Sequence, residues 1–200
     1  MPKPRPQDNR LRFHVDRTWA ATGIVASTEA HLEAHLYADP ARLGCIGANY
    51  GGFMTMLLTT RTDMFGAAVS HAGIRSISSC WGEGNSGFAS SVATTAKSCP
   101  WNRPDISIDQ SPLFAADKVV TLLLLHRAVD IDVPPGESEQ MFTALCVLGK
   151  EVEYIRNDDE LHWILQYDRR KRWSESVVAW FDKQLRNNAA WWGHRWPEDE

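Results

Sequence analysis

The sequence predicts an α/β fold in which one parallel sheet carries helices on both of its faces. The chain has 200 residues, which is enough for a single domain with one sizeable core. Short apolar runs alternate with helical patterns, an order that favours a parallel sheet with right-handed crossovers. One of these runs, residues 119–125, is apolar at every position except Thr121, as in strands that are buried on both faces.

The first half of the chain contains two expected strands and two expected helices. Residues 19–37 form an Ala-rich helical pattern, which Asp39-Pro40 should end because a residue before proline avoids the helical region. Residues 43–48 are a short apolar strand, and residues 51–61 have the spacing of a helix. The run GAAVSH at 66–71 predicts a second strand.

The middle of the chain has no sustained periodicity. Residues 73–110 are rich in Ser, Gly, Trp and Pro, and they predict an irregular excursion with one helix near 90–97. Ser111-Pro112 should open a short helix that runs to Asp117.

The second half again alternates. After the buried strand at 119–125, a Pro-Pro-Gly turn precedes an amphipathic helix at 137–148, which Gly149 should end. Residues 151–156 predict a fourth strand, and residues 168–185 predict a long final helix.

Composition excludes several classes of partner. The net charge is −4, and only the run Arg169-Arg170-Lys171-Arg172 is basic, so nucleic acid is not an expected partner. No apolar stretch approaches the ~20 residues of a membrane span, and no secretory signal is visible, so a cytoplasmic location is expected. The four cysteines show no paired spacing; Cys45 and Cys146 fall inside a strand and a helix pattern and are expected to be buried thiols.

A motif with a chemical meaning follows the first strand. Gly47-Ala48-Asn49-Tyr50-Gly51 matches the G-x-S-x-G turn that holds a nucleophilic serine, with asparagine in place of the serine. Asp130 follows the third strand and His162 follows the fourth. Function in such sheets sits at the carboxyl ends of the strands, and the order nucleophile, acid, histidine is that of α/β-hydrolases. We therefore expect positions 49, 130 and 162 to converge.

Three separated stretches sharpen this expectation. DPARLGCIGANYGGFMT, LLLLHRAVDIDVPPGESEQMFTAL, and EVEYIRNDDELHWI with RWSESVVAWFDKQL together resemble the prolyl oligopeptidase family of serine peptidases over residues 38–185. The resemblance implies an α/β-hydrolase domain truncated at its N-terminal half. Residues 1–37 would be a poorly matched segment with a helix, and residues 38–200 the C-terminal part of the domain. Peptides or oligopeptides would be the substrates.

The resemblance also assigns roles to residues. Position 49 would be the nucleophile, Asp130 the acid and His162 the general base, with the backbone N–H of Tyr50 as one oxyanion donor. Asp132 competes with Asp130 for the role of the acid. Arg127 and Asp159 stand where the family usually has glycine, at strand ends where a positive φ or close backbone approach is often needed.

Asn49 changes the expected chemistry. An amide nitrogen has no useful lone pair, so it cannot form an acyl-enzyme, and the chain is expected to be catalytically impaired or inactive. Hydrolysis of the Asn49 amide to a carboxylate is an alternative source of a nucleophile. A second function class is a non-catalytic peptide-binding or interaction protein on the same scaffold.

Other candidate sites are weaker. His31 and His35 lie four residues apart on one helix face but lack the order and third ligand of a zinc motif, so no metal and no cofactor are expected. Cys45, Cys80 and Cys99 are discounted as nucleophiles. If residues 1–37 give no strand, the strand at 43–48 lies at a sheet edge, and self-association through that edge is expected.

Overall fold

A computed structural model describes residues 17–83, 100–127, 129–157 and 162–197. The expectations for residues 1–16 and for a helix near 90–97 fall outside these ranges, as does Asp159. Within them, four parallel strands form one sheet in the order β1-β2-β3-β4. The strands are β1 (Gly44–Ala48), β2 (Ala67–His71), β3 (Thr121–Arg127) and β4 (Glu151–Asn157).

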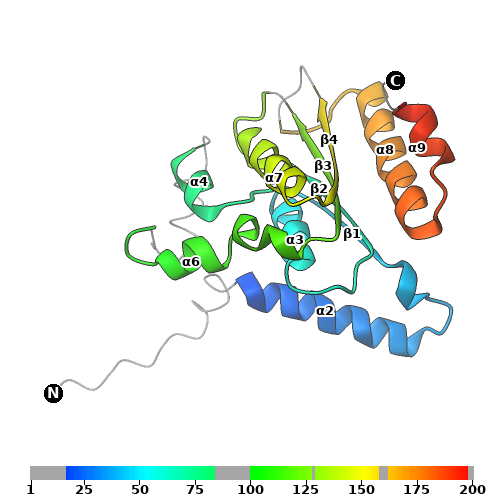
Figure 1. The fold of residues 1–200 in the computed structure, drawn as a ribbon, viewed down its shortest axis with the longest axis horizontal. Helices are drawn as coiled ribbons and strands as arrows, with labels where there is room; N and C mark the ends of the chain where they lie inside the picture. Colours follow the sequence, from blue (N-terminus) through cyan, green and yellow to red (C-terminus); the bar gives the residue numbers. More distant parts are fainter. Residues whose placement is uncertain (1–16, 84–99, 128, 158–161, 198–200) are drawn as a thin grey trace.

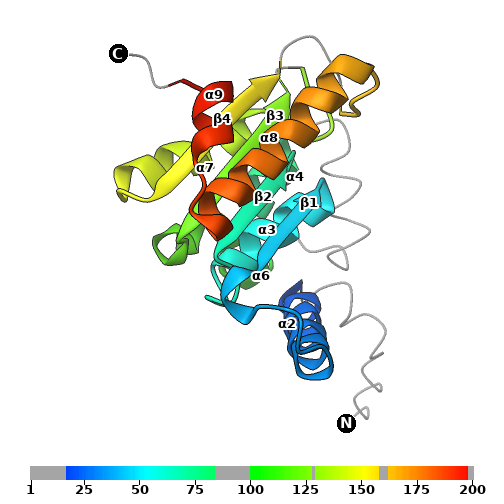
Figure 2. The same cartoon turned by 90° about the vertical axis from the view of Figure 1, so that its right-hand side faces the viewer.

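Helices cover both faces of the sheet, which confirms the predicted fold class (Figures 1 and 2). On one face lie α3 and α7, with η2 beside them, and on the other lie α8 and α9. The helices along the chain are α2 (Arg17–Ala34), η1 (Pro40–Arg42), α3 (Tyr50–Thr59), α4 (Ile77–Gly82), α6 (Pro104–Asp109), η2 (Pro112–Lys118), α7 (Gly136–Val147), α8 (Tyr167–Arg186) and α9 (Ala190–Arg195).

Strand β3 joins the two apolar layers. Leu122 and Leu124 pack into the cluster under α3 and α7, whereas Leu123 and Leu125 pack into the cluster under α8 and α9. All four side chains are fully buried, as expected for a strand covered on both faces. Alternate residues of a strand point to opposite faces, so one uninterrupted apolar run supplies both layers.

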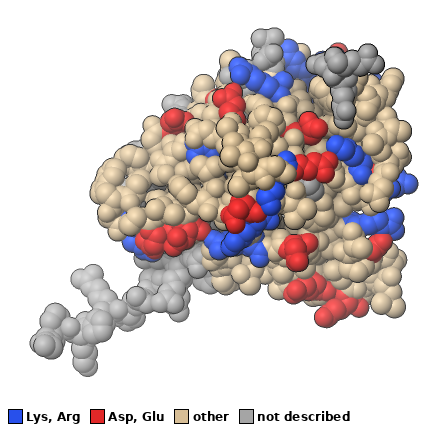
Figure 3. All heavy atoms as spheres, in the orientation of Figure 1, with Lys and Arg blue, Asp and Glu red and all other residues tan. Residues whose placement is uncertain are grey.

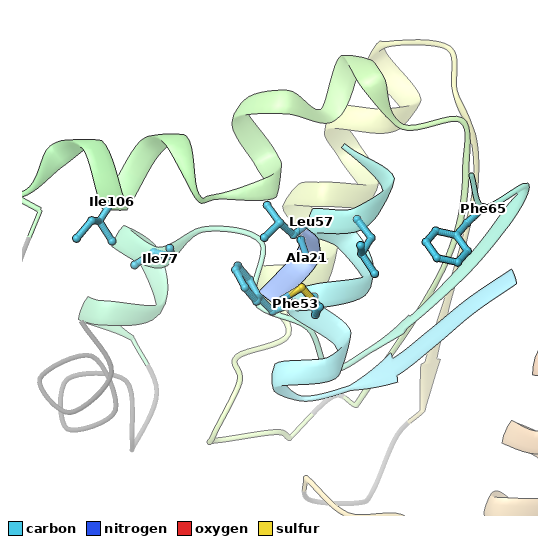
Figure 4. Packing of buried hydrophobic residues seen from close by; sticks show 8 residues of the cluster. Ala21, Phe53, Leu57, Phe65, Ile77 and Ile106 are labelled. Atoms are coloured by element: carbon cyan, nitrogen blue, oxygen red, sulfur yellow. The ribbon is translucent and has the colours of Figure 1, made fainter. Parts of the chain in front are cut away.

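A third apolar cluster lies around α3 (Figure 4), and Cys45 of β1 packs against it. Phe53 and Leu57 of α3 contact Ala21 of α2 here, and Ile77 of α4 and Ile106 of α6 extend the cluster. Both short helices bury an apolar residue in this cluster, which explains why the segment folds without a long periodic pattern.

The structure corrects several element boundaries. Helix α2 ends at Ala34 rather than near position 37, and the next side chains, Leu36 and Tyr37, are 96% and 81% exposed. Tyr37 instead lies edge-on against the rings of His31 and His35, with centroids 6.5 and 5.4 Å away, a contact made beyond the end of the helix. Three short α-helices, α4, α6 and α9, were not expected at all, and neither was the 3-10 helix η1. Each of the three α-helices is only 6 residues long, too short to be stable without tertiary contacts.

Two expectations about cysteine were wrong. Cys146 is exposed, because α7 turns Met141 and Leu145 toward the core and the neighbouring position toward solvent. Cys45 is only partly buried, because β1 lies at an edge of the sheet. Its sulfur is still shielded enough that burial raises the pKa of the Cys45 thiol to about 12. Cys45 is therefore protonated at neutral pH and is a poor nucleophile.

Charged side chains of both signs are interspersed on the face drawn in Figure 3, and apolar and uncharged polar surface separates them. No single-sign field of the kind that recruits nucleic acid is visible on this face. Among the described helices, none combines the length and the apolar character that a membrane crossing requires.

Strand β1 forms an outer edge of the described sheet, since its one strand neighbour there is β2. Its residues alternate between exposed and partly buried, and the Ile46 side chain is 47% exposed. An apolar edge with unpaired backbone groups is a template for pairing with another chain. We therefore predict that the chain self-associates through this edge.

The variant Ile46→Lys tests the prediction, because a charge on an edge strand opposes pairing. We expect light scattering coupled to size-exclusion chromatography to show a concentration-dependent increase in mass that this variant reduces. Val147→Lys is the matched control, since Val147 is 82% exposed at the end of α7 and lies off the edge. A monomer at high concentration, or equal effects of both variants, would contradict the prediction.

Candidate active site

The turn between β1 and α3 holds Asn49 in a strained conformation. Asn49 has φ 56° and ψ −118°, a region that residues with a Cβ rarely occupy. Its backbone N–H donates to the carbonyl of His71 at 2.9 Å, and its own carbonyl accepts from Phe53 N at 3.0 Å. The turn is thus fixed to the end of β2 on one side and to the first turn of α3 on the other.

Glycines allow this turn to close. A Cβ at Gly47 would lie 2.2 Å from the carbonyl oxygen of Gly51, and a Cβ at Gly52 would lie 2.5 Å from that of His71. A Cβ at Gly51 would meet nothing within 4 Å. The sequence motif pointed to Gly47 and Gly51, but the close approaches are at Gly47 and Gly52.

The structure brings the three expected side chains together. Asn49 Nδ2 lies 2.8 Å from His162 Nε2, and His162 Nδ1 lies 2.8 Å from Asp130 Oδ2. Asn49 is exposed, whereas the side chains of His162 and Asp130 are 7% and 0% exposed. The site therefore has an open end at position 49 and a shielded end at the carboxylate.

The contact with Asn49 matches one tautomer of the imidazole. The amide nitrogen of Asn49 can only donate, so this contact is a hydrogen bond when Nε2 of His162 carries no proton. The proton then sits on Nδ1 and is donated to Asp130. This neutral tautomer is the form in which a histidine takes a proton through Nε2.

Backbone groups hold Asp130 in place. Its Oδ1 accepts the N–H of Asp132 at 3.0 Å and that of Val133 at 2.9 Å, which leaves Oδ2 for His162. Asp132 supplies its backbone N–H to this turn. Of the two candidate acids, Asp130 is the one in contact with the imidazole.

Asp130, Asp132 and His162 also form a group whose potential metal-ligating atoms lie within 4.8 Å of one another. Hydrogen bonds already account for the close approach of Asp130 and His162. His31 and His35 stack with ring centroids 4.1 Å apart, and His35 Nδ1 lies 2.9 Å from the carbonyl oxygen of His31. In the described ranges, neither group is better explained by a metal than by these contacts.

The expectation of a positive φ at position 127 was wrong. Arg127 is the last residue of β3 and lies in register with Asn157 of β4. It is an ordinary strand residue, and the described non-glycine residues with positive φ are Asn49, Ala72 and Asn187.

Sequence reasoning missed the part that His71 plays beside the site. His71 supplies the carbonyl that holds the Asn49 turn. The expected packing of Trp163 against His162 is present, with ring centroids 5.5 Å apart. His71 ends a strand, which places it at the same edge of the sheet as the site. Its contact is made through the main-chain carbonyl, so the residue type carries no signal for it.

A buried carboxylate ties the acid-bearing loop to the segment that follows β2. Glu137 lies in the first turn of α7 with 0% exposure, and its Oε2 accepts the N–H of Arg75 at 2.9 Å and of Ser76 at 3.2 Å. Burial raises the pKa of the Glu137 carboxyl above its usual value; the Ser79 hydroxyl, the Arg75 cation and the two backbone N–H groups oppose part of that rise.

The variant Glu137→Gln is expected to change how stability depends on pH. Because the folded chain holds the Glu137 proton more tightly than the unfolded chain, stability is lost as pH rises from about 4.5 through the raised pKa. The glutamine variant lacks this loss. The difference in free energy of unfolding, variant minus unchanged chain, should therefore increase as pH rises across this window. Urea unfolding at a series of pH values measures the difference.

The matched control for this measurement is Glu139→Gln on the same helix. Glu139 is 45% exposed and pairs with Arg156 at 3.2 Å on the surface. The raised pKa of Glu137 is supported if relative stability increases with pH in Glu137→Gln and does not do so in Glu139→Gln. Parallel pH profiles for Glu137→Gln and the unchanged chain would refute it.

Comparison with known proteins agrees with this geometry. The family model described as the prolyl oligopeptidase family matches residues 16–188. The chain belongs to the prolyl oligopeptidase family.

Curated members of the prolyl oligopeptidase family are similar at the level of sequence. The chain is 29% identical over 166 residues to an uncharacterized peptidase, YuxL, of Bacillus subtilis, covering 81% of this chain and 25% of the relative. It is 27% identical over 169 residues to dipeptidyl-peptidase 5 of Porphyromonas endodontalis, covering 82% of this chain and 24% of the relative. The chain thus spans about a quarter of the length of these curated relatives.

A solved structure shows the same fold. The acylaminoacyl peptidase of Pyrococcus horikoshii superimposes with a TM-score of 0.82 at 28% identity. The match covers 90% of this chain and 30% of the peptidase chain. The four-stranded sheet and its helices therefore correspond to part of a larger hydrolase fold.

Proposed function

We propose that this chain carries the nucleophile, acid and histidine positions of a peptidase hydrolase domain, and that Asn49 leaves it without the nucleophile. The proposal rests on one observation, the chain of contacts from Asn49 through His162 to Asp130, with 2.8 Å at each step. The strained turn at Asn49 supports it, because this geometry presents a side chain at the mouth of a site.

The chemistry that remains is that of an acid–base pair without an attacking atom. His162 is in the tautomer that accepts a proton, and Asp130 would stabilise the imidazolium that forms. Asn49 offers an amide, which cannot attack a carbonyl. Loss of a triad nucleophile leaves at most roughly 10³–10⁴-fold over water, so hydrolysis by the chain as it stands should be close to undetectable.

The relatives suggest the substrate class. Their names describe an acylaminoacyl peptidase and a dipeptidyl-peptidase, so peptides are the substrates we propose for a chain with a functional nucleophile. Because the chain spans only about a quarter to a third of these proteins, peptide specificity is left outside the proposal.

The proposal is tested on the unchanged chain with a fluorophosphonate probe, which labels an activated serine. We expect no label, and we expect intact mass and peptide mapping to find Asn49 unmodified. Labelling at any residue would contradict the absence of a nucleophile. A mass increase of about one dalton that maps to position 49 would show instead that the amide has been hydrolysed to a carboxylate.

A further inference from the structure

A cavity of about 370 Å³ lies where β3 and β4 end beside α8, on the opposite face of the sheet from α3. Figure 2 shows α8 and α9 lying over the sheet on this side. Six residues give the cavity its chemical character: Arg156, Asn157, Arg169, Arg172, Trp173 and Trp196. None of them belongs to the contacts between Asn49, His162 and Asp130.

The lining is cationic. Three of the lining residues are arginines, and none of the described residues that line the cavity is Asp or Glu. Arg156 pairs with Glu139 at 3.2 Å, so its charge is partly compensated. The guanidinium of Arg172 has no ion pair and donates no hydrogen bond among the described residues, and its side chain is exposed. Arg172 therefore has its full donor set available to a ligand in the cavity.

A second observation is independent of the arginines. The indole N–H of Trp173 is buried and has no acceptor among the residues that the structure describes. A buried donor without an acceptor costs free energy. Trp173 lines the cavity, and its ring system makes a T-shaped contact with the His71 ring, with ring centroids 5.9 Å apart. A ligand with acceptor oxygens in this cavity would lie against that side chain.

We propose that this cavity binds a small oxyanion, a carboxylate or a phosphate, with Arg172 as its main anchor. The planar guanidinium fork matches both groups in a bidentate manner, and the amide of Asn157 can add a donor. Trp173 and Trp196 supply flat apolar walls for the organic part of a ligand. The volume falls within the range of small-molecule sites and exceeds the needs of a bare ion.

This binding site lies close to the candidate active site and does not depend on its chemistry. His162 lies in the sequence between β4 and α8, and Asn157 at the end of β4 and Arg169 near the start of α8 line the cavity. A test of anion binding therefore needs no catalytic activity. Its failure and the failure of the proposed function can be told apart.

The experiment is isothermal titration calorimetry of the unchanged chain at constant ionic strength. One arm uses inorganic phosphate, and the other uses an N-acetyl dipeptide with a free carboxylate beside the same dipeptide as its C-terminal amide. We expect saturable binding in at least one arm and none to the amide. Saturation by phosphate alone assigns a phosphate ligand, and saturation by the dipeptide alone assigns a carboxylate.

Variants locate the site. Arg172→Gln should weaken binding roughly tenfold or more, the loss expected for a hydrogen bond to a charged group. Arg172→Lys keeps the charge but loses the planar guanidinium fork. Its affinity for the anion should lie between that of the unchanged chain and that of Arg172→Gln. Lys171→Gln is the matched control, because Lys171 is the neighbouring residue of α8, is 60% exposed and does not line the cavity. Circular dichroism melts verify that each variant is folded.

Two results would overturn the proposal. No saturable heat in either arm at millimolar ligand would show that the cavity holds no oxyanion. Equal weakening by Arg172→Gln and Lys171→Gln would show that the chain attracts anions through its general charge rather than through this site.

Discussion

The variant Asn49→Ser is expected to hydrolyse activated esters and small peptide amides roughly 10³-fold faster than the unchanged chain. Removing the nucleophile of a serine triad costs about 10⁶ in turnover, and a missing oxyanion donor costs about 10²–10³. The described residues offer the Tyr50 N–H as one expected oxyanion donor. The gain in rate should therefore be smaller than the full factor of about 10⁶. The group that receives the serine proton is close by, since His162 Nε2 lies 2.8 Å from the Asn49 amide.

The serine hydroxyl is one bond shorter than the asparagine amide, so His162 must shift toward it for the hydrogen bond to form. Hydrolysis of a p-nitrophenyl ester and fluorophosphonate labelling at position 49 measure the gain. Asn49→Ala should stay silent, and Asn49→Ser combined with His162→Gln should lose what Asn49→Ser gains. A folded Asn49→Ser variant with neither activity nor label would show that these residues do not form a working catalytic frame.

The variant Gly47→Ala is expected to lower the free energy of unfolding by about 3 kcal/mol, the upper end of typical overpacking costs. The added methyl carbon would lie 2.2 Å from the carbonyl oxygen of Gly51 and 2.3 Å from its carbonyl carbon. These are backbone atoms in the first turn of α3, so no side-chain rotation relieves the clash. The strand and the helix must separate, and the turn that holds Asn49 must open.

Gly51→Ala provides a control within the same motif. A Cβ at Gly51 meets nothing within 4 Å, and the residue lies inside α3, where alanine is favoured over glycine by up to about 1 kcal/mol. We therefore expect unchanged or slightly increased stability. Urea unfolding of both variants measures the contrast. Equal stability of the two would mean that α3 does not approach β1 as closely as the structure shows.

The parts of the fold that the sequence predicts are those whose signal is local. The run at 119–125 predicts a strand buried on both faces because every residue in it except Thr121 is apolar, and Leu122 to Leu125 fill both layers. Gly149 was expected to end α7, and it does so with a φ of 64°. These features require no knowledge of what lies opposite in the fold.

The features that escaped prediction depend on distant contacts. Helix α9 is stabilised by Trp192, which packs on Trp180 of α8 with ring centroids 5.1 Å apart. The six residues of α9 carry no sequence pattern that predicts this contact. Cys146 reads like a core residue of an amphipathic helix, but its exposure depends on how α7 is rotated about its axis. At the candidate site, the motif locates positions 49, 130 and 162. That a Cβ would clash at Gly47 but not at Gly51 can be seen only in the three-dimensional structure.

The double role of β3 has a consequence for how this molecule comes apart. Alternate leucines of that strand anchor helices on opposite sides, so the layer with α7 and the layer with α8 share one backbone. Fluctuations that release one layer also remove support from the other. Such an arrangement favours loss of structure as a single cooperative event, and hydrogen exchange of amides under both layers should then report the same opening free energy.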